Sequence, residues 1–318
     1  MHTPVLLIIF KRPELTRRVL RSIAAAKPST LLVAADGPRG EFEAEACAQT
    51  RAVISEIDWP CNVITNFADK NLGCGIRVYT AIDWALSIFQ EVIILEDDCV
   101  PNPSFFTFCE ELLATYRDDE RVMHISGNNF VDRASASPYS YRFSKYTHAW
   151  GWATWRRAWQ YFDWSVSRWP ELQAAGILDA CCSDPYEREY WRPIFDRMHE
   201  GAPDVWDYQW NLACWSQSGL AVLPNVNLVS NIGFGEDATH TKDDNEFLSR
   251  PTAAIDEIRH PPYVVRDAAA DAITFDRNFG GAEMKARDSR EARLRRQLDP
   301  VLRPLRGVKR LLRKVTRS

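Results

Sequence analysis

This chain of 318 residues lacks the sequence features of a membrane-spanning, disulfide-rich, zinc-binding or secreted protein. No hydrophobic run approaches the roughly 20 residues that a membrane-crossing helix needs, and none of the eight cysteines forms a Cys-x-x-Cys pair. The cysteines therefore predict neither a disulfide framework nor a zinc site. The apolar stretch at 5–10 follows only four residues and lacks the flanks of a signal peptide. We therefore expect a cytoplasmic protein, free or on the cytosolic face of a membrane.

The net charge of −4 is small but unevenly distributed. Residues 285–318 hold 13 Lys or Arg and three acids, a net charge of +10, so the other 284 residues carry −14. Apolar residues recur every three or four positions in this basic tail, and Pro300 and Pro304 divide it into two predicted helices. This pattern is typical of an amphipathic helix on an anionic membrane; a helix packed on the acidic body, or a solvated tail, is the alternative. The acidic body argues against a nucleic-acid partner.

The first half of the chain alternates strand and helix signals. At 46% hydrophobic residues, the chain can bury a large core. The predicted strands are 4–10, 30–38, 61–67 and 92–95, and the predicted helices are 11–26, 41–57 and 71–89. Such alternation predicts an α/β fold with a mixed, mostly parallel sheet flanked by helices.

Charged residues follow each predicted strand. They are Lys11-Arg12, Asp36, Asp69-Lys70 and the run Glu96-Asp97-Asp98. In parallel sheets the ligand crevice lies outside the carboxyl ends of the strands. The sequence therefore predicts a ligand site at this edge.

The second half is rich in tryptophan. Trp152, Trp155 and Trp159 recur at helical spacing, which indicates a core-facing helix, whereas Trp150 and Trp152 flank Gly151 and are predicted to face a sugar. Residues 219–224 resemble a strand. We divide the chain into a domain at 1–245, with halves 1–130 and 131–245, an irregular, partly extended wrap-around segment at 246–284, and the basic tail.

Three consecutive carboxylates repel one another unless something neutralises them. Mg²⁺ and Mn²⁺ take oxygen ligands, commonly one or two carboxylates together with substrate phosphates. The run Glu96–Asp98 therefore predicts a divalent cation that bridges the protein and a diphosphate. A polar strand end, whose acids cap the next turn, is the simpler structural interpretation.

Four segments together resemble glycosyltransferases with the GT-A fold. They are "LLIIFKRPE", "ADGPR", "NLGCGIR" and "VIILEDDCVPNPSFFTFCEELL". The resemblance is greatest to family-2-like enzymes and N-acetylglucosaminyltransferases, and it covers roughly residues 3–245. It implies a Rossmann-like nucleotide-sugar half and an Asp98 that binds the metal, with Glu96 and Asp97 at the nucleotide-sugar site.

The resemblance also implies contacts to the rest of the donor. Asp36 would contact the nucleoside, and Arg12 and Arg77 would face the nucleotide. His240, in a glycine-rich loop, would touch the metal or the diphosphate. The glycines of "NLGCG" resemble a phosphate-binding turn, although Gly-x-Gly alone is a weak signal.

Sugar transfer needs a base for the proton of the attacking hydroxyl. Asp207 stands between Trp206 and Tyr208, whose rings could stack on a sugar, and the resemblance makes Asp207 this base. An N-cap role for Asp207 is the structural alternative. In other family-2 enzymes the base is the Asp of a Glu-Asp pair, which here is Asp237.

We therefore expect a metal-dependent, inverting glycosyltransferase that uses Mn²⁺ or Mg²⁺. Its donor would be a nucleotide-diphosphate sugar, with UDP the expected nucleotide, and its acceptor a glycan or glycolipid in polysaccharide biosynthesis. An inactive glycan-binding or assembly protein is one alternative. The other is a sugar-1-phosphate nucleotidyltransferase, which would need a glycine-rich basic loop after the first strand, where this chain has "KRPE".

Overall fold

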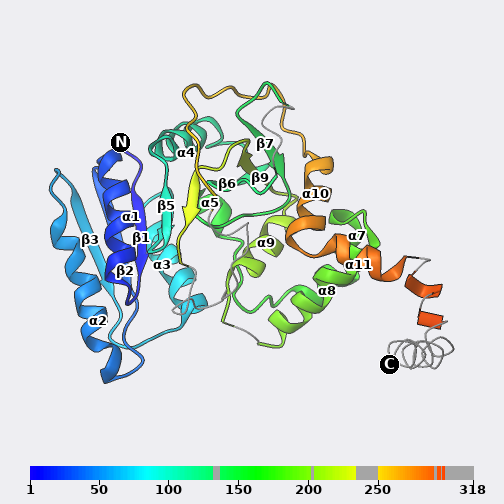
Figure 1. Ribbon diagram of the computed structural model, residues 1–318, viewed down its shortest axis with the longest axis horizontal. Coiled ribbons are helices and arrows are strands. Elements are labelled where there is room, and N and C mark those ends of the chain that lie inside the picture. The colour runs from blue at the N-terminus through cyan, green and yellow to red at the C-terminus, as the bar shows by residue number, and fades with distance from the viewer. Residues whose placement is uncertain (132–136, 202–203, 234–249, 290–291, 295, 298–318) are drawn as a thin grey trace, which may run out of the picture.

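A computed structural model describes residues 1–131, 137–201, 204–233, 250–289, 292–294 and 296–297. Its main feature is a sheet of eight strands in the order β3-β2-β1-β4-β8-β6-β9-β7 (Figure 1). The strands are β1 (Val5–Ile9), β2 (Thr30–Ala35), β3 (Asn62–Phe67), β4 (Glu91–Glu96), β6 (Val122–Ser126), β7 (Tyr141–Ser144), β8 (Trp152–Trp155) and β9 (Leu220–Pro224). Outside it, β5 (Cys99–Pro101) pairs antiparallel with β10 (Val229–Asn231).

The sheet is mostly parallel. β3, β2, β1 and β4 pair in parallel, as do β6 and β9, whereas β8 and β7 run antiparallel to their neighbours. The helices between the first strands are α1 (Pro13–Ala26), α2 (Glu41–Ala52), followed by the 3₁₀ turn η1 (Val53–Glu56), and α3 (Cys74–Ile88). The predicted α/β fold class and the order of these elements are confirmed.

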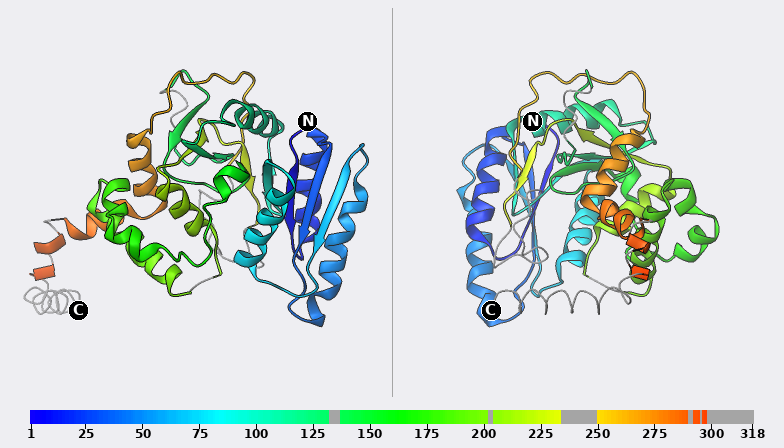
Figure 2. Two further views of the ribbon diagram at one scale, coloured as in Figure 1. Left: turned by 180° about the vertical axis from the view of Figure 1, so that it is seen from behind. Right: turned by 45° about the vertical axis from the view of Figure 1, so that its right-hand side comes forward.

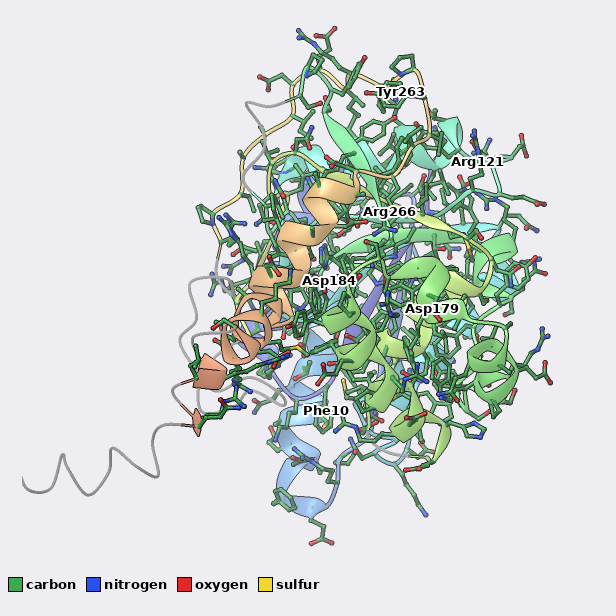
Figure 3. All side chains as sticks on the ribbon, turned by 90° about the vertical axis from the view of Figure 1, so that its right-hand side faces the viewer. Phe10, Arg121, Asp179, Asp184, Tyr263 and Arg266 are labelled. Carbon is green, nitrogen blue, oxygen red and sulfur yellow. The ribbon has the colours of Figure 1, made fainter. Side chains whose placement is uncertain are left out.

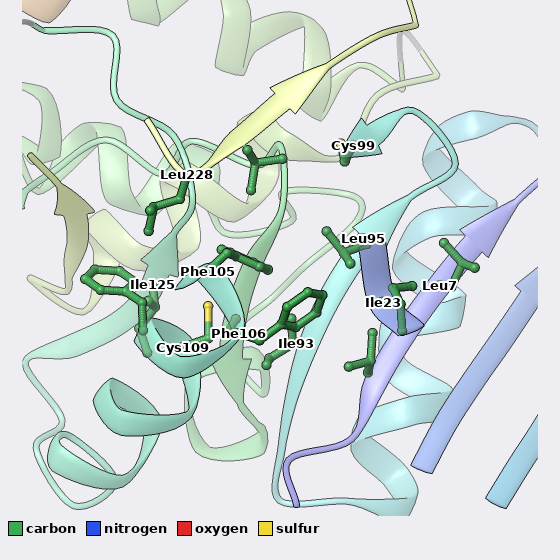
Figure 4. Close-up of a cluster of buried hydrophobic side chains, with 14 of the residues drawn as sticks. Leu7, Ile23, Ile93, Leu95, Cys99, Phe105, Phe106, Cys109, Ile125 and Leu228 are labelled. Carbon is green, nitrogen blue, oxygen red and sulfur yellow. The ribbon is translucent and has the colours of Figure 1, made fainter. Parts of the chain in front are cut away.

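Helices cover both faces of the sheet, which is why the central strands are apolar throughout. Val5, Leu7 and Ile9 face α1 and α4 (Pro103–Thr115), whereas Leu6 and Ile8 face α3. Figure 4 shows the first of these layers, where Leu7, Ile23, Leu95 and Phe105 gather. Burying each such side chain contributes about 1.5–3 kcal/mol. The strand ends are thereby fixed by packing on both sides.

A separate core holds the second half together. It is built on α8 (Pro185–His199) and α9 (Asp207–Ser216), with α6 (Trp169–Ala174) and α7 (Ile177–Cys181) beside them. The short helix α5 (Arg156–Trp159) packs instead in the layer of α3. Tyr146, Trp191 and Trp215 are fully buried in it. The buried ion pair between Lys145 and Glu187 ties the end of β7 to α8.

The wrap-around segment differs from its prediction. Residues 250–267 are irregular, but α10 (Ala268–Asn278) and α11 (Gly281–Asp288) are helices that lie on the outside of the second half (Figure 2). The Asp267 side chain caps α10 by accepting from the Ala270 amide at 2.9 Å. Phe275 and Phe279 pack on the aromatic core beside Tyr190. Prolines at 251, 261 and 262 favoured an irregular, partly extended segment throughout, whereas only its first part is irregular.

The tryptophan segment also differs from its prediction. Trp152 and Trp155 belong to strand β8, not to a helix, and both are buried. Their spacing of three places them on opposite faces of the sheet, Trp152 in the layer of α3 and Trp155 in the layer of α4. Each tryptophan is therefore buried under the helices that cover its own face of the sheet.

Candidate functional site

The acidic run ends a central strand of the sheet. β4 pairs with β1 on one side and β8 on the other, and its residues Val92–Leu95 are fully buried. Glu96 closes the strand opposite Ile8, and Asp97 and Asp98 form the turn that leads into β5. The three carboxylates therefore lie at the carboxyl edge of the parallel strands, as predicted.

Arg12 supplies a positive charge to this run. It occupies the position before the first residue of α1, and its guanidinium pairs with Asp97 and, at 2.8 Å, with Asp98. The Phe10 amide also donates to Asp97, at 3.3 Å. Burial lowers the pKa of Arg12, but Asp97 and Asp98 outweigh this effect and hold it above its usual value. Arg12 is thus an internal counterion of the acidic run.

One arginine does not balance three carboxylates. Burial, followed by Asp98 and Asp97, raises the pKa of Glu96, and Asp207 adds to this rise. Burial also raises the pKa of Asp97, although Arg12 opposes the rise. The three carboxyl groups therefore disfavour ionisation together, and a cation bound beside them would stabilise their charged forms.

The pairing of β10 with β5 brings a second chain segment to Asp98. Asn231 donates to the Asp98 carboxylate at 3.5 Å, and the Ile232 amide donates to the Asp98 carbonyl at 2.8 Å. A Cβ atom on Gly233 would collide with the Asp98 carboxylate. Gly233 therefore lies next to the predicted metal ligand.

Asp36 organises the loop that precedes α3. Its buried carboxylate accepts from the amides of Gly37 at 2.8 Å and Leu72 at 2.9 Å, and from the Asn71 side chain at 2.8 Å. Burial raises the pKa of Asp36, and the hydrogen bonds from Leu72 and Gly37 oppose this rise. Arg77, also buried, donates to Asn66. In this structure both side chains fix the local backbone.

Asp207 comes to the same region from the second half. It is the first residue of α9, is exposed, and follows Trp206, which holds the capping position. The structural alternative, that Asp207 itself is the N-cap, is therefore wrong by one position. The pKa of the Cys74 thiol at the start of α3 is raised, first by burial and then by four nearby carboxylates: Glu96, Asp204, Asp207 and Asp98. These four carboxylates therefore converge around the first turn of α3.

Two of the three tryptophans predicted to stack on a sugar are core residues. Trp152 is 1% exposed and Trp206 is 5% exposed, and their rings stack on each other at 5.5 Å. A ring buried on both faces leaves no surface for a sugar, so this prediction is corrected. Trp150 is half-buried, with its ring edge-to-face on Phe130.

Two predicted residues lie outside the described part of the chain. Asp237, the alternative base, and His240, the predicted donor contact, both belong to 234–249. The same holds for most of the basic tail, of which α11 covers the beginning.

Asp204 is a site residue that the sequence analysis missed. Its carboxylate accepts from the amides of Cys74 and Gly75, each at 2.7 Å. The sequence held one signal, because α3 begins after Gly73 and has no capping side chain of its own. The partner, 130 residues further along the chain, could not be found that way.

The chemistry of the acidic run fits a hard divalent cation. The available donors are carboxylate oxygens, whose charged forms a cation would stabilise. Among the described residues no group of three or more His, Cys, Asp or Glu is arranged to hold a metal ion. A cation at Asp98 would therefore take further ligands from a bound phosphate group or from water.

A surface cavity of about 520 Å³ lies elsewhere. Its lining includes Tyr116, Arg121, His260 and Tyr263 and none of the site acids. Figure 3 shows Tyr263 far from Phe10, the residue that follows β1. The cavity is therefore not part of the candidate site.

No family model matches the chain, and no curated protein matches it. Solved structures with a similar course of the chain include a UTP-bound UGPase from Acinetobacter baumannii, with 8% identity, a TM-score of 0.35, and coverage of 70% of this chain and 86% of that one. HddC from Yersinia pseudotuberculosis, complexed with GMP-PN, has 9% identity, a TM-score of 0.31, and coverage of 48% and 78%. The 4-diphosphocytidyl-2C-methyl-D-erythritol synthase from Anaerococcus prevotii has 7% identity, a TM-score of 0.31, and coverage of 50% and 74%. Similarities this distant assign no activity.

Proposed function

We propose that this protein is a metal-dependent, inverting glycosyltransferase. It moves a sugar from a nucleotide-diphosphate donor, with UDP the first nucleotide to test, to a hydroxyl group of a glycan or lipid-linked acceptor. One observation carries the proposal: three adjacent carboxyl groups, two of them paired with Arg12, end a central parallel strand, and a separate exposed carboxylate, Asp207 of the second half, is near enough to raise the pKa of Glu96.

The donor would bind at the carboxyl ends of β1, β2 and β4. Asp98 would hold a Mn²⁺ or Mg²⁺ ion, which supplies charge stabilisation to the departing diphosphate when it is bound. Arg12, already beside Asp97 and Asp98, would add positive charge there. Asp36 and Arg77 would hold the 66–72 region in shape around the nucleoside.

Asp207 would accept the proton of the acceptor. The acceptor oxygen forms a bond to the anomeric carbon while the bond to the diphosphate oxygen breaks on the opposite side, so the configuration inverts. The hydroxyl proton must leave as this happens, and an exposed carboxylate on the acceptor side can take it. Asp207 meets this requirement because it starts α9 at the surface.

The connection after β1 favours a glycosyltransferase over a nucleotidyltransferase. Only Phe10, Lys11 and Arg12 separate β1 from α1, and Pro13 starts the helix directly. A glycine-rich loop that wraps a nucleoside triphosphate has no room in these three residues.

Titration calorimetry with UDP and GDP, with and without Mn²⁺, tests the donor site. We expect Mn²⁺-dependent binding of UDP, weakened at least about tenfold in Asp98→Ala because the cation loses its protein ligand. Asp179→Ala is the matched control, since Asp179 is an exposed acid in the second half (Figure 3).

Two results would redirect the proposal. If neither nucleotide binds in the presence of metal, the inactive glycan-binding protein becomes the better interpretation. If the protein instead converts a nucleoside triphosphate and a sugar 1-phosphate to a nucleotide sugar, it is a nucleotidyltransferase.

The proposal also places the protein at an anionic membrane surface. No helix in the described ranges has the length and apolar character needed to cross a membrane. The basic tail would instead bring the enzyme to a lipid-linked acceptor through its charge and its apolar stripe.

A further inference from the structure

Helix α3 takes its N-terminal cap from the other half of the molecule. Gly73 precedes the helix with φ of +87° and has no side chain to cap it. The amides of Cys74 and Gly75 have no acceptor within the helix, and they donate to the two carboxylate oxygens of Asp204 at 2.7 Å each. A carboxylate suits this place because the helix N-terminus carries partial positive charge.

The backbone around this contact is closely packed. A Cβ atom on Gly75 would lie 2.6 Å from the Trp164 ring and 2.9 Å from the Val205 nitrogen. A Cβ atom on Gly73 would lie 2.6 Å from the Asp204 carboxylate. The loop that holds Asp204 and Val205 therefore rests directly on the first turn of α3.

The same loop delivers Asp207. Trp206, between Val205 and Asp207, is buried and stacks on Trp152 of β8, the strand beside β4. Asp207 then starts α9, only three residues after Asp204. Asp204 and Trp206 are thus two anchors on the short approach to Asp207.

The opposite side of the α3 start is held by Asp36. Asp36 binds Asn71 and Leu72, and Asp204 binds Cys74 and Gly75. Two acids from different halves thus hold one short segment, 71–75. This segment links the carboxyl end of β2 to the loop that carries Asp207.

We propose that Asp204 is a positioning residue, which fixes Asp207 relative to Asp98 by tying the 204–206 loop to the start of α3. This role rests on the proposed function, which makes Asp98 the metal ligand and Asp207 the base. Asp204 acts through backbone amides and touches neither donor nor acceptor. Its loss should therefore impair the chemical step and leave donor binding intact.

The first experiment is the kinetics of Asp204→Ala with a UDP-sugar donor. We expect kcat to fall roughly 10- to 100-fold, because a displacement of about 1 Å at a reacting group has that effect. The KM for the donor and the calorimetric affinity for UDP with Mn²⁺ should stay within about twofold of wild type. Asp204→Asn should recover part of kcat, because its amide oxygen can still accept one of the two hydrogen bonds.

Asp184→Ala is the matched control. Asp184 caps α8 by accepting from the Tyr186 amide at 2.9 Å, and it belongs to the second half (Figure 3). This variant loses a cap of the same kind and should keep wild-type kcat. An Asp204→Ala enzyme that also keeps wild-type kcat would overturn the proposal.

Hydrogen exchange provides a readout that does not depend on activity. In Asp204→Ala we expect roughly 5- to 10-fold faster exchange at Cys74 and Gly75 and also at Trp210, whose amide donates to Trp206 in the first turn of α9. Faster exchange confined to α3 would make Asp204 a cap alone and would overturn the positioning role. If wild type binds no UDP, the proposed function fails, while this exchange pattern still decides whether Asp204 holds the two segments together.

Discussion

At the scale of single residues, His124 is held as a neutral imidazole. Trp210 donates its indole N–H to Nδ1 at 3.1 Å, so Nε2 carries the proton and donates to the His148 carbonyl at 2.9 Å. The ring also stacks on Trp152 at 4.8 Å. Burial lowers the pKa of His124 to about 3, although the hydrogen bond to the His148 carbonyl opposes this.

The lowered pKa of His124 predicts that the folded protein loses stability in mild acid. The unfolded chain binds a proton below about pH 6.5, whereas the folded protein binds it only near pH 3, so stability falls progressively between these values as the pH decreases. At pH 5 the cost is about 2 kcal/mol for this residue. Urea unfolding of wild type and His124→Gln at pH 8 and pH 5 measures it.

The variant should show a smaller difference between the two pH values than wild type. Gln can donate to the His148 carbonyl without titrating, so its own stability at pH 8 is the reference. An unchanged difference would assign the acid sensitivity to other groups, including His148, whose burial also lowers its pKa to about 3.

Sequence reasoning located some of these residues and not others. Glu96–Asp98 stand out because three acids directly follow four apolar residues, and Arg12 because it follows β1 at the same edge. Trp152 and Trp206 could not be placed, because a tryptophan that packs in a core and one that binds a sugar look the same in sequence. Asp204 required knowledge of a contact between distant segments.

At the scale of elements, α4 depends on a cap that follows the acidic run after the short strand β5. The Asn102 side chain accepts from the Ser104 amide at 3.1 Å, and Pro103 occupies the first turn. This helix packs Phe105, Phe106 and Phe108 into the core beneath β4. The cap therefore fixes where the chain passes from β5 into α4, shortly after the proposed metal ligand Asp98.

We expect Asn102→Ala to lower the free energy of unfolding by about 1 kcal/mol, the usual value of such a cap. Denaturant unfolding measures this change, and UDP binding serves as the test that the site is unaffected. Asn102→Asp keeps the capping oxygen and should be nearly as stable as wild type. Equal destabilisation by both variants would mean that the loss of stability does not come from the lost cap.

Element prediction succeeded where one pattern dominated. The strands β1, β2 and β4 are continuous apolar runs, and α1 and α3 have apolar residues at helical spacing. It failed for Trp152–Trp155, where a spacing of three suggested a helix, while the short strand buries both faces. It failed for α10 because the prolines nearby outweighed a helix-forming run of alanines.

At the scale of the whole molecule, the charge of the basic tail predicts binding to anionic vesicles. Each Lys or Arg near such a surface contributes about 1 kcal/mol. Replacing Arg303, Arg306, Lys309 and Arg310 with Gln should therefore weaken binding by two to three orders of magnitude. Co-sedimentation of the full chain with phosphatidylglycerol vesicles measures the effect.

Vesicles of phosphatidylcholine and high salt are the controls, and both should abolish most of the binding. Binding that is insensitive to lipid charge would contradict the electrostatic origin. If the wild-type chain binds no vesicle, the tail serves another role, such as packing on the acidic body.

The order of strands has a consequence for how the chain acquires its fold during synthesis. β8 lies between β4 and β6, although it is made after both of them. Until residue 155 leaves the ribosome, β4 presents an unpaired, apolar edge. During the same time β6 has no strand through which it can join the sheet of β1 to β4. Such edges pair readily with other chains. The nascent first half therefore passes through an aggregation-prone stage that ends only when β8 pairs with both β4 and β6.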